Sequence, residues 1–220
     1  MAGSTDVEAV TLEGVRLVVG GRLLLELERW ALPASRRVLV CGRSGSGKTS
    51  FLQMLAGLLR PASGRVLVAG QDINELPEER RDVFRGRTIG FVFQTLHLVR
   101  ALSVLDNLRL AAFLVGNRVA DRRLLELLER VGLADRADAY TYELSQGEAQ
   151  RIAIARALVN TPRVVLADEP TSALDDERAD TIRRLLVGSA AESGAALVVA
   201  THDSRLVPHF AERLVLGGQG

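Results

Sequence analysis

One stretch of this 220-residue chain limits its fold more than any other: Gly42-Arg43-Ser44-Gly45-Ser46-Gly47-Lys48-Thr49. It fits the pattern G-x-x-x-x-G-K-[ST] in full, after a short apolar run and before an expected helix over Lys48–Leu59. The glycines let backbone N–H groups surround phosphate oxygens, and the helix N-terminus adds the positive end of its dipole. We therefore predict a nucleotide-binding loop over Gly42–Thr49, continued by Ser50. In this loop Lys48 reaches the β- and γ-phosphates, and the Thr49 hydroxyl ligates Mg²⁺.

Lys48 is also the only lysine among 28 basic residues. A surface charge can be arginine or lysine with little consequence, whereas a site that needs a compact ammonium group cannot make that exchange. The single lysine therefore points to a site independently of the motif. The 28 basic and 27 acidic residues leave a net charge of +1, so we expect no nucleic-acid partner.

A second nucleotide element is expected at Val164-Val165-Leu166-Ala167-Asp168-Glu169. Four small or apolar residues indicate a buried strand, and two carboxylates follow at its C-terminal end, where ligands bind in open α/β sheets. We predict that Asp168 holds Mg²⁺, directly or through water. Glu169 is the predicted general base that orients and polarises the attacking water.

Strands and helices alternate along the chain, which predicts an α/β fold with a largely parallel sheet. Two regions depart from the alternation. The first 35 residues indicate a small antiparallel layer, and the mostly helical stretch Thr95–Leu158 indicates an insertion within a single domain over residues 1–220. The expected strands are Arg37–Cys41, Arg65–Ala69, Ile89–Phe93, Arg163–Ala167, Ala195–Ala200 and Arg213–Leu216, and the expected helices after the first are Ser103–Leu114, one capped by Asp121, Gln146–Val159 and Asp175–Glu192.

Several classes of protein are disfavoured by composition. No segment approaches the roughly 18 consecutive apolar residues that a membrane helix needs, so any membrane role is expected to be peripheral. The start, Met1–Val10, carries Asp6 and Glu8 and lacks the basic and apolar regions of a secretory signal. The single cysteine, Cys41, excludes an intramolecular disulfide and fits a reducing compartment.

Four further motifs follow in order. Gln94 comes directly after the expected strand Ile89–Phe93, and Leu144-Ser145-Gln146-Gly147-Glu148 precedes a helix. Ser172-Ala173-Leu174-Asp175 and Thr201-His202-Asp203 come later in the chain. With the phosphate loop and the acidic strand end, these motifs make the chain resemble the ATP-binding cassette (ABC) ATPases over about Val10–Leu216. The stretches Ile89–Asn107 and Leu144–Asp175 look most like the branch that serves lipoprotein release and macrolide efflux.

The resemblance implies a P-loop NTPase core of the RecA-like type and a mechanism that spacing alone does not supply. Two cassettes meet head to tail with two ATP molecules between them, and each site takes the phosphate loop of one subunit and the signature of the other. The helical insertion docks a separate transmembrane permease, which places the subunit on the inner face of the cell membrane. The residues to which the resemblance gives roles are Ser145, Gln146, Gly147 and Glu148 (signature, acting in trans), Gln94 (Mg²⁺ or water, and coupling), His202 (γ-phosphate) and Asp175 (signalling across the dimer).

The chain departs from the family pattern in two places. The usual signature is Leu-Ser-Gly-Gly-Gln, and here Gln146 and Glu148 stand at its third and fifth positions. The family usually stacks an aromatic side chain on adenine, whereas the matching region offers only Val18 or Val19. These departures keep a second hypothesis open, a weakly hydrolysing regulatory module that dimerises on ATP. The retained Glu169 and His202 favour a Mg²⁺-dependent ATPase instead.

Overall fold

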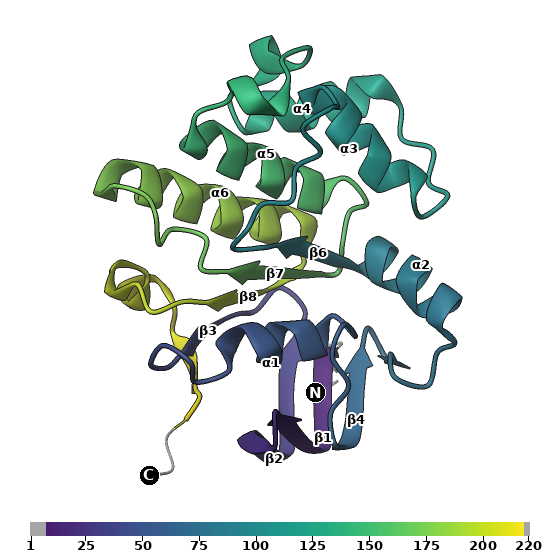
Figure 1. Cartoon of the computed structure of the whole chain (residues 1–220), viewed down its shortest axis with the longest axis vertical. Coiled ribbons are helices and arrows are strands. Elements are labelled where there is room, and N and C mark those ends of the chain that lie inside the picture. The colour runs from purple at the N-terminus through teal and green to yellow at the C-terminus, as the bar shows by residue number, and fades with distance from the viewer. Residues whose placement is uncertain (1–7, 218–220) are drawn as a thin grey trace, which may run out of the picture.

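A computed structural model describes residues 8–217 and consists of two sheets with helices around them (Figure 1). Residues 1–7 and 218–220 lie outside the described residues. They include most of the start for which no secretory signal is expected, and both ends of the expected 1–220 domain. The strands are β1 Glu8–Val19, β2 Arg22–Pro33, β3 Arg37–Cys41, β4 Ser63–Val68, β5 Gln71–Asp72, β6 Ile89–Val92, β7 Val164–Asp168, β8 Ala196–Ala200 and β9 Glu212–Val215. The α-helices are α1 Lys48–Leu55, α2 Glu78–Thr88, α3 Val104–Phe113, α4 Asp121–Arg130, α5 Gln146–Leu158 and α6 Asp176–Ser193, with short 3₁₀ turns at Ala134–Arg136, Thr141–Glu143 and Ser204–His209.

The larger sheet is parallel throughout, in the order β6-β7-β8-β3-β9. Every residue of β7 and β8 is buried, as expected of central strands covered by helices on both faces. The α/β fold predicted from the alternation is therefore confirmed. In this order β8 lies between β7 and β3, so the loops at the carboxyl ends of these three consecutive strands meet at one edge of the sheet.

The smaller sheet is antiparallel, in the order β2-β1-β4-β5, and β1 and β2 form the layer expected from the first 35 residues. The sequence predicts a strand at Arg65–Ala69 but does not predict which sheet it joins. It pairs with β1 as β4, because Val66 and Val68 turn inward to the core that β1 also covers. Figure 1 shows α1 between this sheet and β3. The helix buries Phe51, Leu52, Met54 and Leu55 in the core that the two sheets share.

The structure corrects two predicted helix ends and confirms one predicted cap. The first helix ends at Leu55 rather than Leu59, and Gly57 then adopts a positive φ of 65° against Ile73. Ser103 caps α3 by accepting from the Asp106 N–H, as its spacing indicated. Asp121, however, is the first residue of α4 rather than its cap, and its carboxylate pairs with Arg109.

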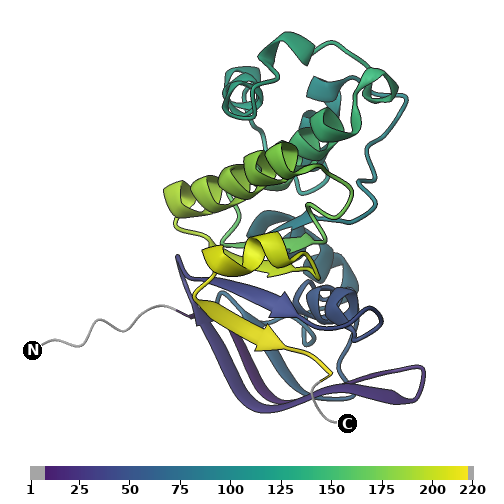
Figure 2. The ribbon, with the colours of Figure 1, turned by 90° about the vertical axis from the view of Figure 1, so that its left-hand side faces the viewer.

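The helices α3, α4 and α5 pack together above β6, and they share one core with α6 and one face of the parallel sheet (Figures 1 and 2). The helix α5 lies against β6 and thus connects this group to the parallel sheet. In the described part of the chain no helix combines the length and apolar character needed to span a bilayer.

Candidate active site

The phosphate loop occupies the turn between β3 and α1, at the carboxyl edge of the parallel sheet. Gly45 and Gly47 have positive φ angles of 74° and 96°, a backbone that side chains adopt with strain. A Cβ on Gly47 would come within 2.7 Å of Leu24 on β2, so space and backbone both require glycine there. The loop leads into the N-terminus of α1, where the first backbone N–H groups have no partner within the helix and can bind an anion.

Lys48 is the first residue of α1 and only 7% exposed. Its Nζ donates to the carbonyl oxygens of Gly42 (3.0 Å) and Arg43 (3.3 Å) and lies 3.6 Å from Oε1 of Glu169. The ammonium group is thus fixed beneath the loop by backbone carbonyls, with one carboxylate opposite it. A phosphate group entering the loop would meet a positive charge that is already oriented.

Asp168 ends β7 and is 3% exposed. Burial raises the pKa of this carboxyl, and a hydrogen bond from the Thr49 side chain acts in the opposite direction. Its Oδ1 is buried and has no hydrogen-bond partner, which is a costly state for a carboxylate oxygen. An unsatisfied carboxylate oxygen beside a hydroxyl is a donor set that suits a hard divalent cation such as Mg²⁺.

Glu169 follows β7 and is held from three sides. Its Oε2 accepts from the Thr201 hydroxyl (2.7 Å) and the His202 N–H (3.3 Å), while Oε1 lies 2.8 Å from Nδ1 of His202. Its φ is 46°, a conformation that costs a non-glycine residue about 1–3 kcal/mol. The register of β7 and β8, which pairs Asp168 with Ala200, brings Glu169 to Thr201 across 32 residues of sequence.

A cleft of about 450 Å³ opens over these groups. Gln94, Glu169 and His202 line it together with the loop, so the structure places the three predicted catalytic side chains at one site. On the far side it is bounded by β1 and β2, and no aromatic side chain of residues 8–217 lines it, in agreement with the missing stacking residue. The lining residues are Val19, Arg22, Leu24, Ser44, Gly45, Gly47, Lys48, Thr49, Ser50, Gln94, Glu169 and His202.

The signature residues lie at the N-terminus of α5, outside this cleft. Ser145 caps the helix by accepting from the Glu148 N–H (3.3 Å), and Glu148 accepts in return from the Ser145 N–H (2.8 Å) and hydroxyl (2.7 Å). These bonds, with Arg136 nearby, lower the pKa of Glu148. The unusual Glu148 is therefore part of a capping box, while Gln146 is exposed.

Asp175 caps α6 by accepting from the Arg178 N–H at 2.9 Å. A hydrogen-bond network near the start of α6 was not predicted from the sequence. In this network the Thr171 hydroxyl donates to Asp203 at 2.6 Å. Arg205 donates to Asp203 and Asp176 and holds the pKa of Asp203 at about 2. Thr201 and Asp203 are the sequence neighbours of His202, and that position was the only sequence signal for them. Thr171 and Asp176 are distant in the sequence, and only the tertiary structure brings them into the network.

Known proteins resemble the chain over most of its length. A family model described as "ABC transporter" matches residues 27–172. The lipoprotein-releasing system ATP-binding protein LolD of Chromohalobacter salexigens is 46% identical over 178 residues, which cover 80% of this chain and 75% of that protein. LolD 1 of Rhodopirellula baltica is 44% identical over 84% and 82% of the two chains. A dimeric structure of the ATP-binding cassette MJ0796, in a post-hydrolysis state bound to ADP and Pi, matches 94% of each chain with a TM-score of 0.84 and 32% identity.

These findings confirm the family resemblance and its lipoprotein-release branch, and they do not favour the hypothesis of a regulatory module. They also confirm ATP binding and ATP hydrolysis as the activity of the chain. The chain belongs to the ABC transporter family, as an ATP-binding and ATP-hydrolysing subunit that energises a separate membrane-embedded transporter.

Proposed function

We propose that this subunit hydrolyses Mg-ATP at sites that two copies of the chain form together. The observation that carries the proposal is the meeting of Lys48, Asp168 and Glu169 at the carboxyl edge of the parallel sheet, with Lys48 Nζ 3.6 Å from Glu169 Oε1. Thr49, Asp168 and Gln94 are the proposed ligands of Mg²⁺, which neutralises phosphate charge when bound. The loop Gly42–Ser50 holds the nucleotide phosphates.

Glu169 is proposed to act as general base. In the nucleotide-free chain Lys48 and His202 both lie beside its carboxylate. A γ-phosphate draws Lys48 toward its own oxygens and leaves Glu169 free to accept a proton from water. The water oxygen then bonds to the γ-phosphorus, the bond from that phosphorus to the ADP oxygen breaks, and the proton moves to Glu169. His202, whose side chain is 64% exposed and lines the cleft, is proposed to hold the γ-phosphate.

The second half of each site is proposed to come from the partner copy. Ser145 and the Gly147 N–H lie at the start of α5 and away from the cleft, so within one chain they contact no nucleotide. Across a head-to-tail dimer these helix-end donors, with Gln146 and Glu148 beside them, face the γ-phosphate. Asp175, exposed at the start of α6, is proposed to signal across the same interface.

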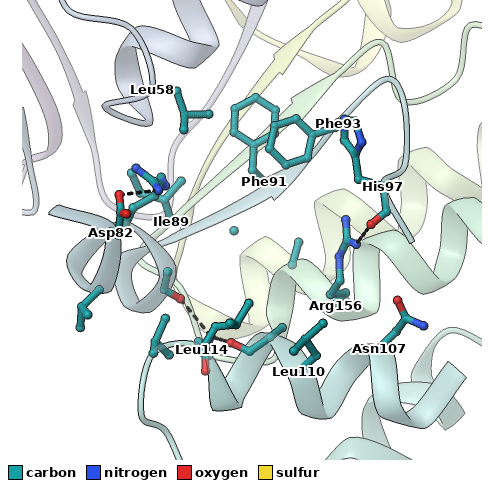
Figure 3. A pocket seen from close by; sticks show the side chains of 18 of the residues that line it. Leu58, Asp82, Ile89, Phe91, Phe93, His97, Asn107, Leu110, Leu114 and Arg156 are labelled. Carbon is teal, nitrogen blue, oxygen red and sulfur yellow. Dashed lines mark hydrogen bonds and ion pairs between the residues drawn. The ribbon is translucent and has the colours of Figure 1, made fainter. Parts of the chain in front are cut away.

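We infer that a transmembrane permease docks on a cavity of about 660 Å³ between α2, β6, α3 and α5 (Figure 3). Apolar side chains dominate its walls, including Phe91, Phe93, Leu110 and Leu114. The cavity lies between the core and the helices of residues 95–158, which we propose as a helical subdomain of a single domain over 1–220. Docking there holds the subunit on the inner face of the membrane, and similarity to LolD favours a partner of the lipoprotein-release type.

The test is the solution mass of the Glu169→Gln variant, measured by light scattering with and without Mg-ATP. The amide keeps the shape of the side chain but cannot accept the proton, so ATP stays bound and the protein is expected to shift from monomer to dimer. The parent protein, which turns ATP over, is the control. A Glu169→Gln variant that hydrolyses ATP at the parent rate would refute the assigned base. One that stays monomeric with ATP bound would refute the dimer of isolated subunits.

A further inference from the structure

Arg156 belongs to α5 but makes its hydrogen bonds outside that helix. Its guanidinium donates to the carbonyl oxygens of Leu96 and His97, each at 2.7 Å (Figure 3). These two residues follow Gln94 in the segment that leaves β6. One side chain thus ties the segment of the proposed Mg²⁺ ligand to the helix that begins at the signature.

The tethered segment has an unusual backbone. His97 has a φ of 48°, which a non-glycine residue adopts only where its surroundings hold it. Its ring lies edge-on to Phe93 with centroids 5.4 Å apart, and Phe93 stacks on Phe91 of β6 at 4.0 Å. The aromatic contacts hold one side of the segment and Arg156 holds its carbonyls.

Arg156 has no carboxylate to account for its position. Within residues 8–217 no acidic side chain forms an ion pair with it, whereas Arg85, which lines the same cavity, pairs with Asp82 at 2.8 Å. Burial lowers the pKa of the Arg156 guanidinium, so its placement has an electrostatic cost. The two carbonyls are the only hydrogen-bond acceptors that it meets in the described chain.

We propose that Arg156 is a positioning residue that orders the segment carrying Gln94 and makes it move with the signature helix α5. The inference rests on the proposed role of Gln94 and assigns no contact between Arg156 and nucleotide. Residues Ser145 and Arg156 are 11 positions apart on one helix, about 16 Å along its axis. A displacement of the helical group therefore reaches both Gln94 and the signature as one rigid movement.

The hydrogen bonds from Arg156 to Leu96 and His97, which we call the tether, also connect the proposed docking cavity with the nucleotide cleft. Arg156, Phe93 and His97 line the proposed docking cavity, and Gln94 lines the nucleotide cleft. A permease segment that presses on the docking cavity therefore contacts the residues that hold Gln94 in place.

The test compares Arg156→Ala and Arg156→Lys with the parent protein. Hydrogen–deuterium exchange in the nucleotide-free state reports the order of residues 93–99 without any activity, through the Val99 amide, which donates to Asn107 Oδ1 at 2.8 Å. In Arg156→Ala this amide is expected to exchange on the order of tenfold faster, because the segment opens locally more often. The Mg²⁺ concentration for half-maximal ATPase activity is expected to rise on the order of tenfold, as for other residues that orient metal ligands. The affinity for ATP without Mg²⁺ is expected to stay at the parent value, because the phosphate loop supplies it.

Lysine keeps the charge but offers a compact ammonium in place of the planar fork, so Arg156→Lys is expected to restore both readouts only in part. It also keeps the proposal testable if the alanine variant fails to fold. The matched control is Arg151→Ala on the same helix, since Arg151 donates to the carbonyl of Val131 at 2.9 Å, far from Gln94 in the chain. The control is expected to leave exchange in residues 93–99 unchanged.

Parent-like exchange in residues 93–99 of both Arg156 variants would overturn the proposal, and so would an equal increase in Arg151→Ala. The companion variant Gln94→Ala separates the two ideas. If it keeps the parent Mg²⁺ dependence, the proposed role of Gln94 fails, while the exchange data still decide whether the tether exists.

Discussion

Replacing Glu148 tests whether the altered signature is an ordered capping box, as its geometry indicates. Two donors of Ser145, its N–H and its hydroxyl, lie 2.8 and 2.7 Å from Glu148 Oε2, and the Glu148 side chain is 18% exposed. Water can reach Ser145, so each lost bond costs about 0.5–1 kcal/mol rather than the larger value of a buried charged bond. The half-exposed pair with Arg136 adds no more than about 0.5 kcal/mol. Glu148→Ala is therefore expected to destabilise the fold by about 1–2.5 kcal/mol, which overlaps the range of lost helix caps.

The assay is urea unfolding at pH 7, with Glu148→Gln as the matched control. The glutamine oxygen can still accept from both donors of Ser145, because both contacts go to one oxygen of Glu148. Glutamine loses only the charge of these bonds and the pair with Arg136, so its cost is expected to be about half that of alanine or less. A cost of about 1–2.5 kcal/mol corresponds to a fall of about 2–10 °C in the melting temperature for a chain of this size. A loss below about 0.5 kcal/mol in Glu148→Ala, or an equal loss in the two variants, would refute the reasoning.

The pH dependence has a defined sign. The hydrogen bonds from Ser145 lower the folded-state pKa of Glu148 below its unfolded value of about 4.3. Its contribution is thus fully present above that unfolded value and is lost as the pH falls through the lower, folded-state pKa. The stability difference between parent and Glu148→Gln is expected to be constant from pH 8 to pH 6 and to shrink below about pH 4. A difference that grows on acidification would contradict the assigned hydrogen bonds.

Three further changes probe the nucleotide site. Lys48→Ala is expected to abolish tight binding of Mg-ATP, which calorimetry measures, and an unchanged affinity would remove the site from this loop. Thr201→Val removes the hydroxyl that donates to Glu169 at 2.7 Å. It is expected to lower kcat by about 10- to 100-fold with little change in ATP affinity, as for other groups that orient a functional side chain. A parent kcat would show that Glu169 does not need this hydrogen bond. Val19→Tyr adds a stacking surface to the cleft and is expected to tighten ATP binding about tenfold, near the lower end of the range for base–aromatic stacking, while the affinity for tripolyphosphate, which has no base, stays constant.

Local patterns were enough for much of the architecture. The strand ranges Arg37–Cys41 and Ile89–Phe93 match β3 and β6 to within a residue, because buried parallel strands are short apolar runs bounded by turn residues. The phosphate loop and the cap at Ser103 were predicted equally well, because both depend on residues close together in the sequence. A glycine with positive φ sets the local turn, and a serine three residues before an acidic side chain caps the helix that follows it. The strand at Arg65–Ala69 shows the limit of such patterns. Its residues predict a strand but not the sheet that it joins, and only its pairing with β1 decides that.

The side-chain partnerships of the site required the tertiary structure. The sequence by itself determined that Lys48, Asp168, Glu169 and His202 are present in the order of a known motif set. It did not determine that Thr201 supports Glu169, because that contact depends on β7 lying in register beside β8. Likewise, the sequence presents Glu148 as a charge near an anion site, and the helix geometry turns it back onto Ser145. Motifs record what the backbone does within a few residues, whereas the order of strands and the packing of α5 on β6 decide which distant side chains meet.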